Sequence, residues 1–238
     1  MHHVKTTLSI IFLSAIASGV HGDVINITTG TDSFDLYSNS NDALFDDASG
    51  NFSSTDLASV HATLNAWGIE TDGMITILPI TTSAGFSLLT LIDQELGFGD
   101  TGVDASISLS STSPSTLGMY INDYNHEVWT LIDPPFGSQT LGALFVWGGD
   151  GSGDAFAWTG LDVGDALSYS FVDNGAVGTA LNAETFQYVS WVDDGWDIVS
   201  TNGFKTEGTS VFTGMVIPGP PVAIALLSAA IGYTRRRH

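Results

Sequence analysis

A segment rich in glycine and aspartate offers the clearest set of metal ligands in this sequence. It reads Gly148-Gly-Asp150-Gly-Ser-Gly-Asp154, and Asp162 and Asp165 follow it closely. Carboxylates separated by glycine allow a backbone to fold around a hard cation such as Ca²⁺. The spacing therefore predicts a calcium site formed by Asp150, Asp154, Asp162 and Asp165. The segment occurs only once, and a glycine-rich turn between two strands is the simpler explanation.

Four tryptophans flank two acidic turns. Trp147 and Trp158 lie on either side of the glycine-rich segment, and Trp191 and Trp196 lie on either side of Asp193-Asp-Gly195. An exposed indole ring at the base of a loop can stack on the C–H face of a sugar. These four side chains are therefore candidates for carbohydrate stacking. The competing interpretation, which the apolar character of tryptophan favours, is that they fill the core of the domain.

The sequence supplies no recognisable catalytic set. His61 and His126 have no Gly-x-Ser-x-Gly nucleophile turn to accompany them. Glu127 and Glu184 fall on predicted strands and keep a glycosidase mechanism open, but 26 acidic residues do not single out a pair. We therefore predict no catalytic residues and a non-enzymatic protein.

Charge and composition exclude several function classes. All 26 acidic residues lie between Asp23 and Glu207, where Lys205 is the only Lys or Arg, so this segment has a net charge of −25 with His neutral. Nucleic acid is an unsuitable partner because no basic patch can displace its counterions. The chain has no cysteine, which excludes disulfides and thiolate metal sites. Such an acidic surface suits a saline exterior or one rich in divalent ions.

The N-terminus has the pattern of a secretory signal peptide. A short basic stretch through Lys5 precedes an apolar run that ends in small residues. Small residues allow cleavage after Ala17 or after Gly22. We prefer Gly22 and place the signal peptide at residues 1–22, because the segment Asp23–Ile27 that follows is typical of a strand.

The C-terminus combines three parts in a fixed order. The first is Pro218-Gly219-Pro220, the second is the apolar stretch Val222–Tyr233, and the third is Arg235-Arg236-Arg237. The prolines end any preceding strand. The apolar stretch is helix-compatible but short for a membrane span. By the positive-inside rule, the arginines stay in the cytoplasm while the body lies outside.

These three parts resemble the PEP-CTERM sorting signal of bacterial surface proteins, over residues 216–238 only. The resemblance implies that an exosortase-type membrane protease reads Pro218-Gly219-Pro220, that Val222–Tyr233 associates transiently with the membrane, and that Arg235–Arg237 form the cytoplasmic stop. Gly219 departs from the family, whose motif has glutamate between the prolines. A C-terminal membrane anchor that is never processed is the alternative.

Residues 23–215 are predicted to form one all-β domain, an antiparallel β-sandwich of jelly-roll type. Short alternating apolar segments are separated by turns rich in Gly and Asp. The clearest strands are 85–92, 105–110, 166–172 and 186–191, in a set of about ten. One helix is expected near 56–67, where apolar residues recur at helical spacing, although a strand remains open there. A hydrophobic helix is expected at 222–233.

These observations predict an exported bacterial protein of the cell surface, outer envelope or extracellular matrix. Its role is expected to be non-catalytic, binding polysaccharide or other surface proteins. The alternative is a secreted carbohydrate-active enzyme or a lectin-like carbohydrate-binding module of jelly-roll type. No cofactor is required by the sequence apart from the calcium considered above.

Overall fold

The computed structural model describes one β-rich unit, which lies within His21–Pro220. The described residues are 21–30, 32–39, 61–82, 85–92, 105–114, 116–122, 128–147, 154–175, 186–203 and 209–219. Most of the predicted signal peptide and the whole of Val222–Arg237 lie outside these ranges, and so does the expected C-terminal helix. Within these ranges, no helix has the length and apolar character needed to cross a membrane.

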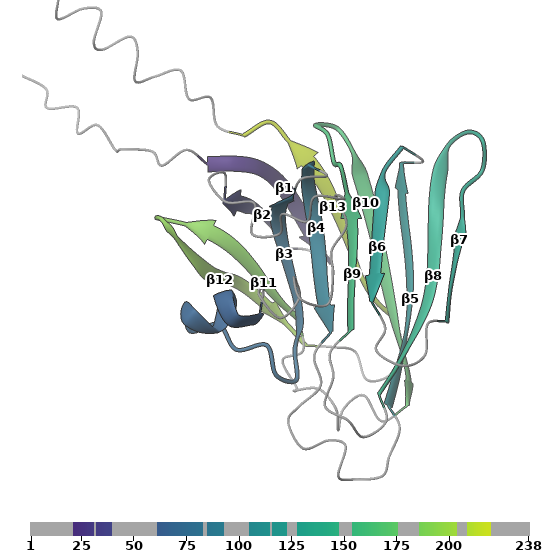
Figure 1. Ribbon diagram of the computed structural model, residues 1–238, viewed down its shortest axis with the longest axis horizontal. Helices are drawn as coiled ribbons and strands as arrows, with labels where there is room; N and C mark the ends of the chain where they lie inside the picture. The colour runs from purple at the N-terminus through teal and green to yellow at the C-terminus, as the bar shows by residue number, and fades with distance from the viewer. Residues whose placement is uncertain are drawn as a thin grey trace, which may run out of the picture. The chain divides into compact units, whose positions relative to one another are not determined.

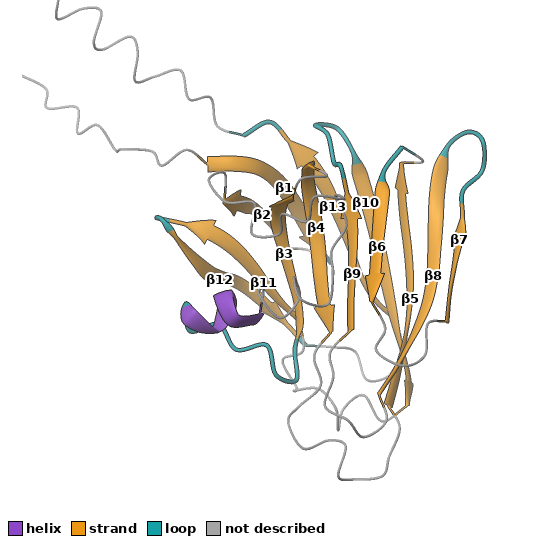
Figure 2. Ribbon diagram, viewed as in Figure 1, coloured by secondary structure: helices purple, strands orange, loops and turns teal. Residues whose placement is uncertain are grey.

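Two sheets form a sandwich, as predicted (Figures 1 and 2). The seven-stranded sheet has the order β2 (Asp32–Asn39), β1 (His21–Thr29), β13 (Thr209–Ile217), β10 (Ala166–Gly175), β5 (Ala105–Pro114), β8 (Ser138–Trp147) and β7 (Val128–Ile132). The six-stranded sheet has the order β12 (Gly195–Asn202), β11 (Phe186–Val192), β3 (Ile75–Thr82), β4 (Gly85–Ile92), β9 (Asp154–Thr159) and β6 (Gly118–Asn122).

The pairing is antiparallel except between β11 and β3, which run parallel from Phe186 opposite Ile75. This single parallel pair is the departure from the predicted antiparallel sandwich. A long connection joins these two strands, as a parallel pair requires, because parallel neighbours cannot be joined by a short hairpin.

Side-chain alternation explains which strands have a solvent face. In β13, Ser210, Phe212, Gly214 and Val216 are buried, while Val211 and Met215 between them are exposed. In contrast, β4 and β9 are buried almost throughout, so both faces of these strands are covered. The sequence of a strand that is buried on both faces is continuously apolar and does not alternate between apolar and polar residues.

An aromatic core fills the space between the sheets. Tyr169 on β10 stacks on Phe212 on β13 with ring centroids 4.3 Å apart, and Phe156 on β9 meets Tyr169 edge-on at 5.9 Å. A second apolar cluster covers the outer face of the six-stranded sheet. Its members include Leu64 and Ile69, which are contributed by the short helix at residues 61–66 and the turn after it.

That helix is the described part of the helix expected near 56–67, and it ends before Trp67 (Figure 2). Sequence reasoning did not predict β2 and β12. Their sequences, DSFDLYSN and GWDIVSTN, mix polar and apolar residues without a clean period of two. Both strands lie at sheet edges, where solvent tolerates such composition.

Strand β2 brings the two sheets together at one side. The backbone N–H of Tyr37 donates to Ser190 Oγ on β11 at 2.9 Å. Phe34, also on β2, meets Tyr188 of β11 edge-on with centroids 4.9 Å apart. These contacts fix β11 and β12 against the seven-stranded sheet.

Candidate functional site

The described carboxylates of the predicted calcium site lie at opposite ends of β9, with Asp154 at one end and Asp162 and Asp165 beyond the other. Asp154 is buried at the start of β9, in register with Ile92 at the end of β4. Asp162 and Asp165 follow the other end of β9, where the Leu161 N–H donates to Phe86 O near the start of β4. Six strand residues separate these ends by about 20 Å.

Asp162 and Asp165 instead shape a turn. Asp165 Oδ2 accepts a hydrogen bond from the Asp162 backbone N–H at 2.8 Å, and the Val216 N–H donates to Asp165 O at 2.9 Å. Asp150 lies outside the described residues. Within the described ranges, no three His, Asp or Glu side chains are grouped so that they could hold a metal ion.

The four tryptophans predicted as sugar platforms have different surroundings. Trp158 is completely buried between the sheets and cannot stack on a ligand at the surface. Trp196 is 4% exposed and lies in the outer apolar cluster, where the half-buried Trp191 packs against it. Trp147 is the last residue of β8, and its side chain is outside the described part.

The remaining residues singled out in the sequence fall mostly outside the described ranges. His126, Glu127 and Glu184 are among them. His61 begins the described helix, and its Nδ1 lies 3.0 Å from Thr71 Oγ1. Pro218 and Gly219 follow the end of β13, whereas Pro220 and Arg235–Arg237 are not described.

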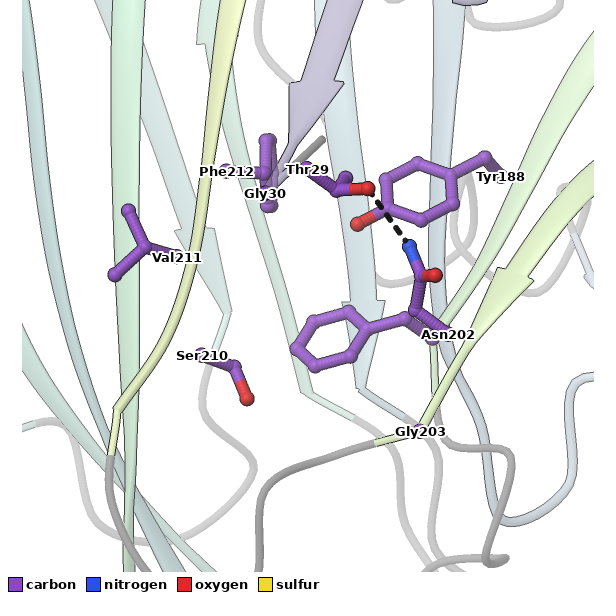
Figure 3. Close-up of a pocket in the computed structure, with 9 residues that line it drawn as sticks. Thr29, Gly30, Tyr188, Asn202, Gly203, Ser210, Val211 and Phe212 are labelled. Carbon is purple, nitrogen blue, oxygen red and sulfur yellow. Dashed lines mark hydrogen bonds between the residues drawn. The ribbon is translucent and has the colours of Figure 1, made fainter. Parts of the chain in front are cut away.

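A pocket opens between the two sheets at a place that the sequence did not indicate (Figure 3). It has a volume of about 230 Å³. Strand ends from both sheets build it, since the lining comes from β1, β13, β11 and β12 and the residues that follow them. The lining residues are Thr29, Gly30, Phe186, Tyr188, Asn202, Gly203, Ser210, Val211 and Phe212.

A hydrogen bond between the sheets crosses this pocket. Asn202 Nδ2, at the end of β12, donates to Thr29 Oγ1, at the end of β1, at 3.1 Å (Figure 3). The Asn202 side chain also hydrogen-bonds the Tyr188 side chain. Asn202 is therefore the central polar group of the pocket, and it is only half-buried.

Tyr188 is held in its neutral form. Burial raises the pKa of Tyr188 to about 12, and the hydrogen bond with Asn202 opposes that rise without cancelling it. The phenol is therefore protonated at any physiological pH, and its hydroxyl can both donate and accept hydrogen bonds.

The lining has a definite chemical character. Phe186, Tyr188 and Phe212 supply aromatic rings, while Thr29, Asn202 and Ser210 supply neutral hydrogen-bonding groups. None of the nine lining residues carries a charge, although the chain has a net charge of −21. Such a lining matches a small neutral ligand that has an apolar face and several hydroxyl groups.

Sequence reasoning missed this pocket because its parts are far apart in the chain. Thr29 and Asn202 are 173 positions apart, and no local motif joins them. The alternation in the segments 186–191 and 210–216 was visible, but the pocket depends on which strand ends face each other. Pairing between distant strands sets that arrangement.

Comparisons with protein-family models, with curated proteins and with solved structures find no match to this chain. The function therefore has to be argued from the residues themselves.

Proposed function

We propose that this chain is an exported, non-catalytic surface or matrix protein whose β-sandwich binds one neutral sugar unit of a polysaccharide in the Thr29–Tyr188–Asn202 pocket. The observation that carries the proposal is the uncharged aromatic and hydroxyl lining of that pocket within a strongly acidic chain. Export and surface sorting rest on the pattern of the two chain ends.

Size and polarity both support a sugar unit. A volume of about 230 Å³ is below the usual range for drug-sized ligands and suits a single ring. Sugar hydroxyls pair with neutral amide and hydroxyl groups such as those of Asn202, Thr29 and Ser210, and the C–H face of a sugar suits an aromatic ring. An anionic sugar would be repelled, because the body of the chain has only one Lys and no Arg.

The alternative of a carbohydrate-active enzyme makes a different demand. Glycoside hydrolysis of the common type requires two carboxyl groups at the scissile bond. The nine lining residues contain none. Incubation of any sugar ligand with the protein, followed by measurement of new reducing ends, tests this alternative directly.

A glycan array with the full-length protein, followed by calorimetric titration of the best neutral ligand, tests the proposal. Asn202→Ala removes the central polar group and should weaken binding about tenfold or more, because a sugar hydroxyl loses its partner. Asn174→Ala is the matched control, since Asn174 Nδ2 also donates to a hydroxyl, Ser108 Oγ at 2.7 Å, but lies outside the pocket. Equal binding by both variants, or no neutral glycan bound by the wild type, would refute the proposal.

A further inference from the structure

Three tryptophans from separate elements contact one another edge to face beside the β11–β12 turn. Trp67 follows the helix at 61–66 and is 50% exposed. Its ring meets Trp191 at 82° with centroids 5.9 Å apart, and Trp191 meets Trp196 at 80° with centroids 5.4 Å apart. Trp67 and Trp191 therefore meet nearly at a right angle, with the edge of one ring against the face of the other, and this pair is called the corner below.

The corner is held in place by its surroundings. Trp196 is buried in the outer apolar cluster and holds Trp191 in place from below the surface. Trp67 lies directly over Gly195, where a Cβ atom would come within 2.9 Å of its ring. Because Gly195 has no side chain, the indole of Trp67 can pack against this residue while half of the Trp67 surface stays exposed.

Two exposed aspartates form the turn that joins Trp191 to Trp196 along the chain. Val192 pairs with Gly195, so Asp193 and Asp194 form a two-residue hairpin turn, and both are exposed. Their φ angles are 49° and 67°, as a type I′ turn requires. Aspartate is one of the residues that tolerate positive φ in such turns, and its presence at both positions also gives the turn two negative charges.

An indole face and a carboxylate both attract cations. A cation over the face of tryptophan is attracted by the negative face of the ring, and nearby carboxylates add a Coulomb attraction that salt weakens. The net charge of −21 also steers cationic ligands toward the protein. A neutral sugar would use the indole and leave the charges unused.

We propose that the Trp67–Trp191 corner with Asp193 and Asp194 is a second site, which binds a cationic amino sugar. The C–H face of the sugar ring stacks on the exposed indole of Trp67, and its ammonium group faces the turn carboxylates. This site shares no residue with the Thr29–Tyr188–Asn202 pocket. The site lies at the other end of the β11–β12 hairpin. The proposal of this second site is therefore independent of the proposed function.

Fluorescence and calorimetric titration of the full-length protein with glucosamine oligomers tests this site. The matched ligand is the N-acetylated oligomer of equal length, which has the same ring but no charge. We expect the glucosamine oligomer to bind at least about tenfold more tightly at low salt, and this preference to shrink several-fold at about 0.5 M NaCl.

The variant Asp193→Asn/Asp194→Asn keeps side chains that tolerate positive φ and removes both charges. It should lose the preference for the cationic oligomer and flatten the salt dependence. Trp67→Phe, which keeps an aromatic ring, should weaken both ligands less than Trp67→Ala does. The matched control is Asp197→Asn. Asp197 pairs with Ser190, whose hydroxyl faces β2, so it lies on the opposite face of the same hairpin from the tryptophans.

Equal affinity for the two oligomers, or an equal effect of the turn variant and Asp197→Asn, would overturn the proposal. The proposal would also be overturned if Asn202→Ala abolished binding of the cationic oligomer while the Asp193→Asn/Asp194→Asn variant still bound it. In contrast, loss of neutral-glycan binding in Asn202→Ala with the charge preference retained would show that the two sites are separate.

Discussion

Trp158 on β9 donates a hydrogen bond from Nε1 to Ser111 Oγ on β5 at 2.8 Å, and so links the two sheets through their core. Ser111 Oγ donates in turn to Ser168 O on β10 at 2.7 Å. A tryptophan that the sequence offered as a sugar platform is thus a structural residue, and its polar N–H is satisfied inside the sandwich.

This relationship predicts a specific stability loss. Ser111→Ala leaves the buried indole N–H without an acceptor and should lower the free energy of unfolding by about 1–3 kcal/mol. Urea denaturation followed by tryptophan fluorescence measures the change. Ser110→Ala is the control, because Ser110 is the neighbouring residue and is exposed. An equal effect at the two positions would contradict the role assigned to Ser111.

Two buried threonines on neighbouring strands should respond in opposite directions to the same substitution. Among the described residues, Thr90 Oγ1 is buried and has no hydrogen-bond partner, whereas Thr76 Oγ1 accepts from Gln187 Nε2 at 2.7 Å. Thr90→Val should raise the free energy of unfolding by up to about 1 kcal/mol, and Thr76→Val should lower it by about 1–3 kcal/mol. Urea midpoints of the two variants provide the comparison. The explanation fails if Thr90→Val is the more damaging change.

Alkaline pH should destabilise the fold through its buried phenols. Burial raises the pKa of Tyr188 to about 12 and that of Tyr169 well above its usual value of 10.0. An unfolded tyrosine ionises near pH 10, so the stabilising effect is complete below pH 10 and is lost as pH rises toward 12. The free energy of unfolding, measured with urea from pH 9 to 12, should fall across this window. Tyr188→Phe should reduce the slope, and an unchanged slope would show that Tyr188 ionises normally.

Gly214 should be intolerant of a methyl group for a local reason. A Cβ atom at this position would come within 2.9 Å of Ile25 Cδ1. Gly214→Ala should therefore cost about 1–3 kcal/mol of stability, and Ile25→Val in the same chain should restore part of it by removing that Cδ1 atom. Gly142→Ala is the control, because a Cβ atom there would meet nothing within 4 Å. Thermal unfolding of these three variants and of the wild type measures the differences in stability.

The arginine tail makes a separate prediction about localisation. Replacing Arg235–Arg237 with glutamine should disrupt membrane retention and sorting, whereas lysine at all three positions should preserve them, since charge is the feature that resists translocation. Cell fractionation measures the distribution. Unchanged localisation of the glutamine variant would remove the interpretation of the tail as a sorting signal.

The predictable parts of the fold are those determined by local pattern. The alternation of β10 and the apolar run of β4 identified these strands and the all-β class. The parallel pairing of β3 with β11 had no local signal, because it joins Ile75 to Phe186 across most of the domain. Polar edge strands such as β2 also lack a signal in the sequence, because strands are predicted from the periodic spacing of apolar residues.

The functional residues were harder to predict because exposure decides their role. Trp158 was a candidate for sugar stacking and Trp67 was not, yet Trp158 is completely buried and Trp67 is 50% exposed. The sequence gives the residue type but not the exposed fraction of either side chain. The exposure of Trp67 is determined by how the helix at 61–66 packs over the β11–β12 hairpin, and this packing is visible only in the structure.

The antiparallel pair β1 and β13 has a consequence for access to a ligand. Val24 pairs with Ile217, so the chain enters and leaves the sandwich at the same end (Figure 1). Thr29 and Ser210 mark the opposite end of this pair, about 20 Å away along the strand. A C-terminal segment that continues after Gly219 is therefore joined to the domain at the end of β13 that is remote from the pocket. If the protein is held at a surface through its C-terminal segment, as proposed, the point of attachment and the pocket residues Thr29 and Ser210 lie at opposite ends of this strand pair.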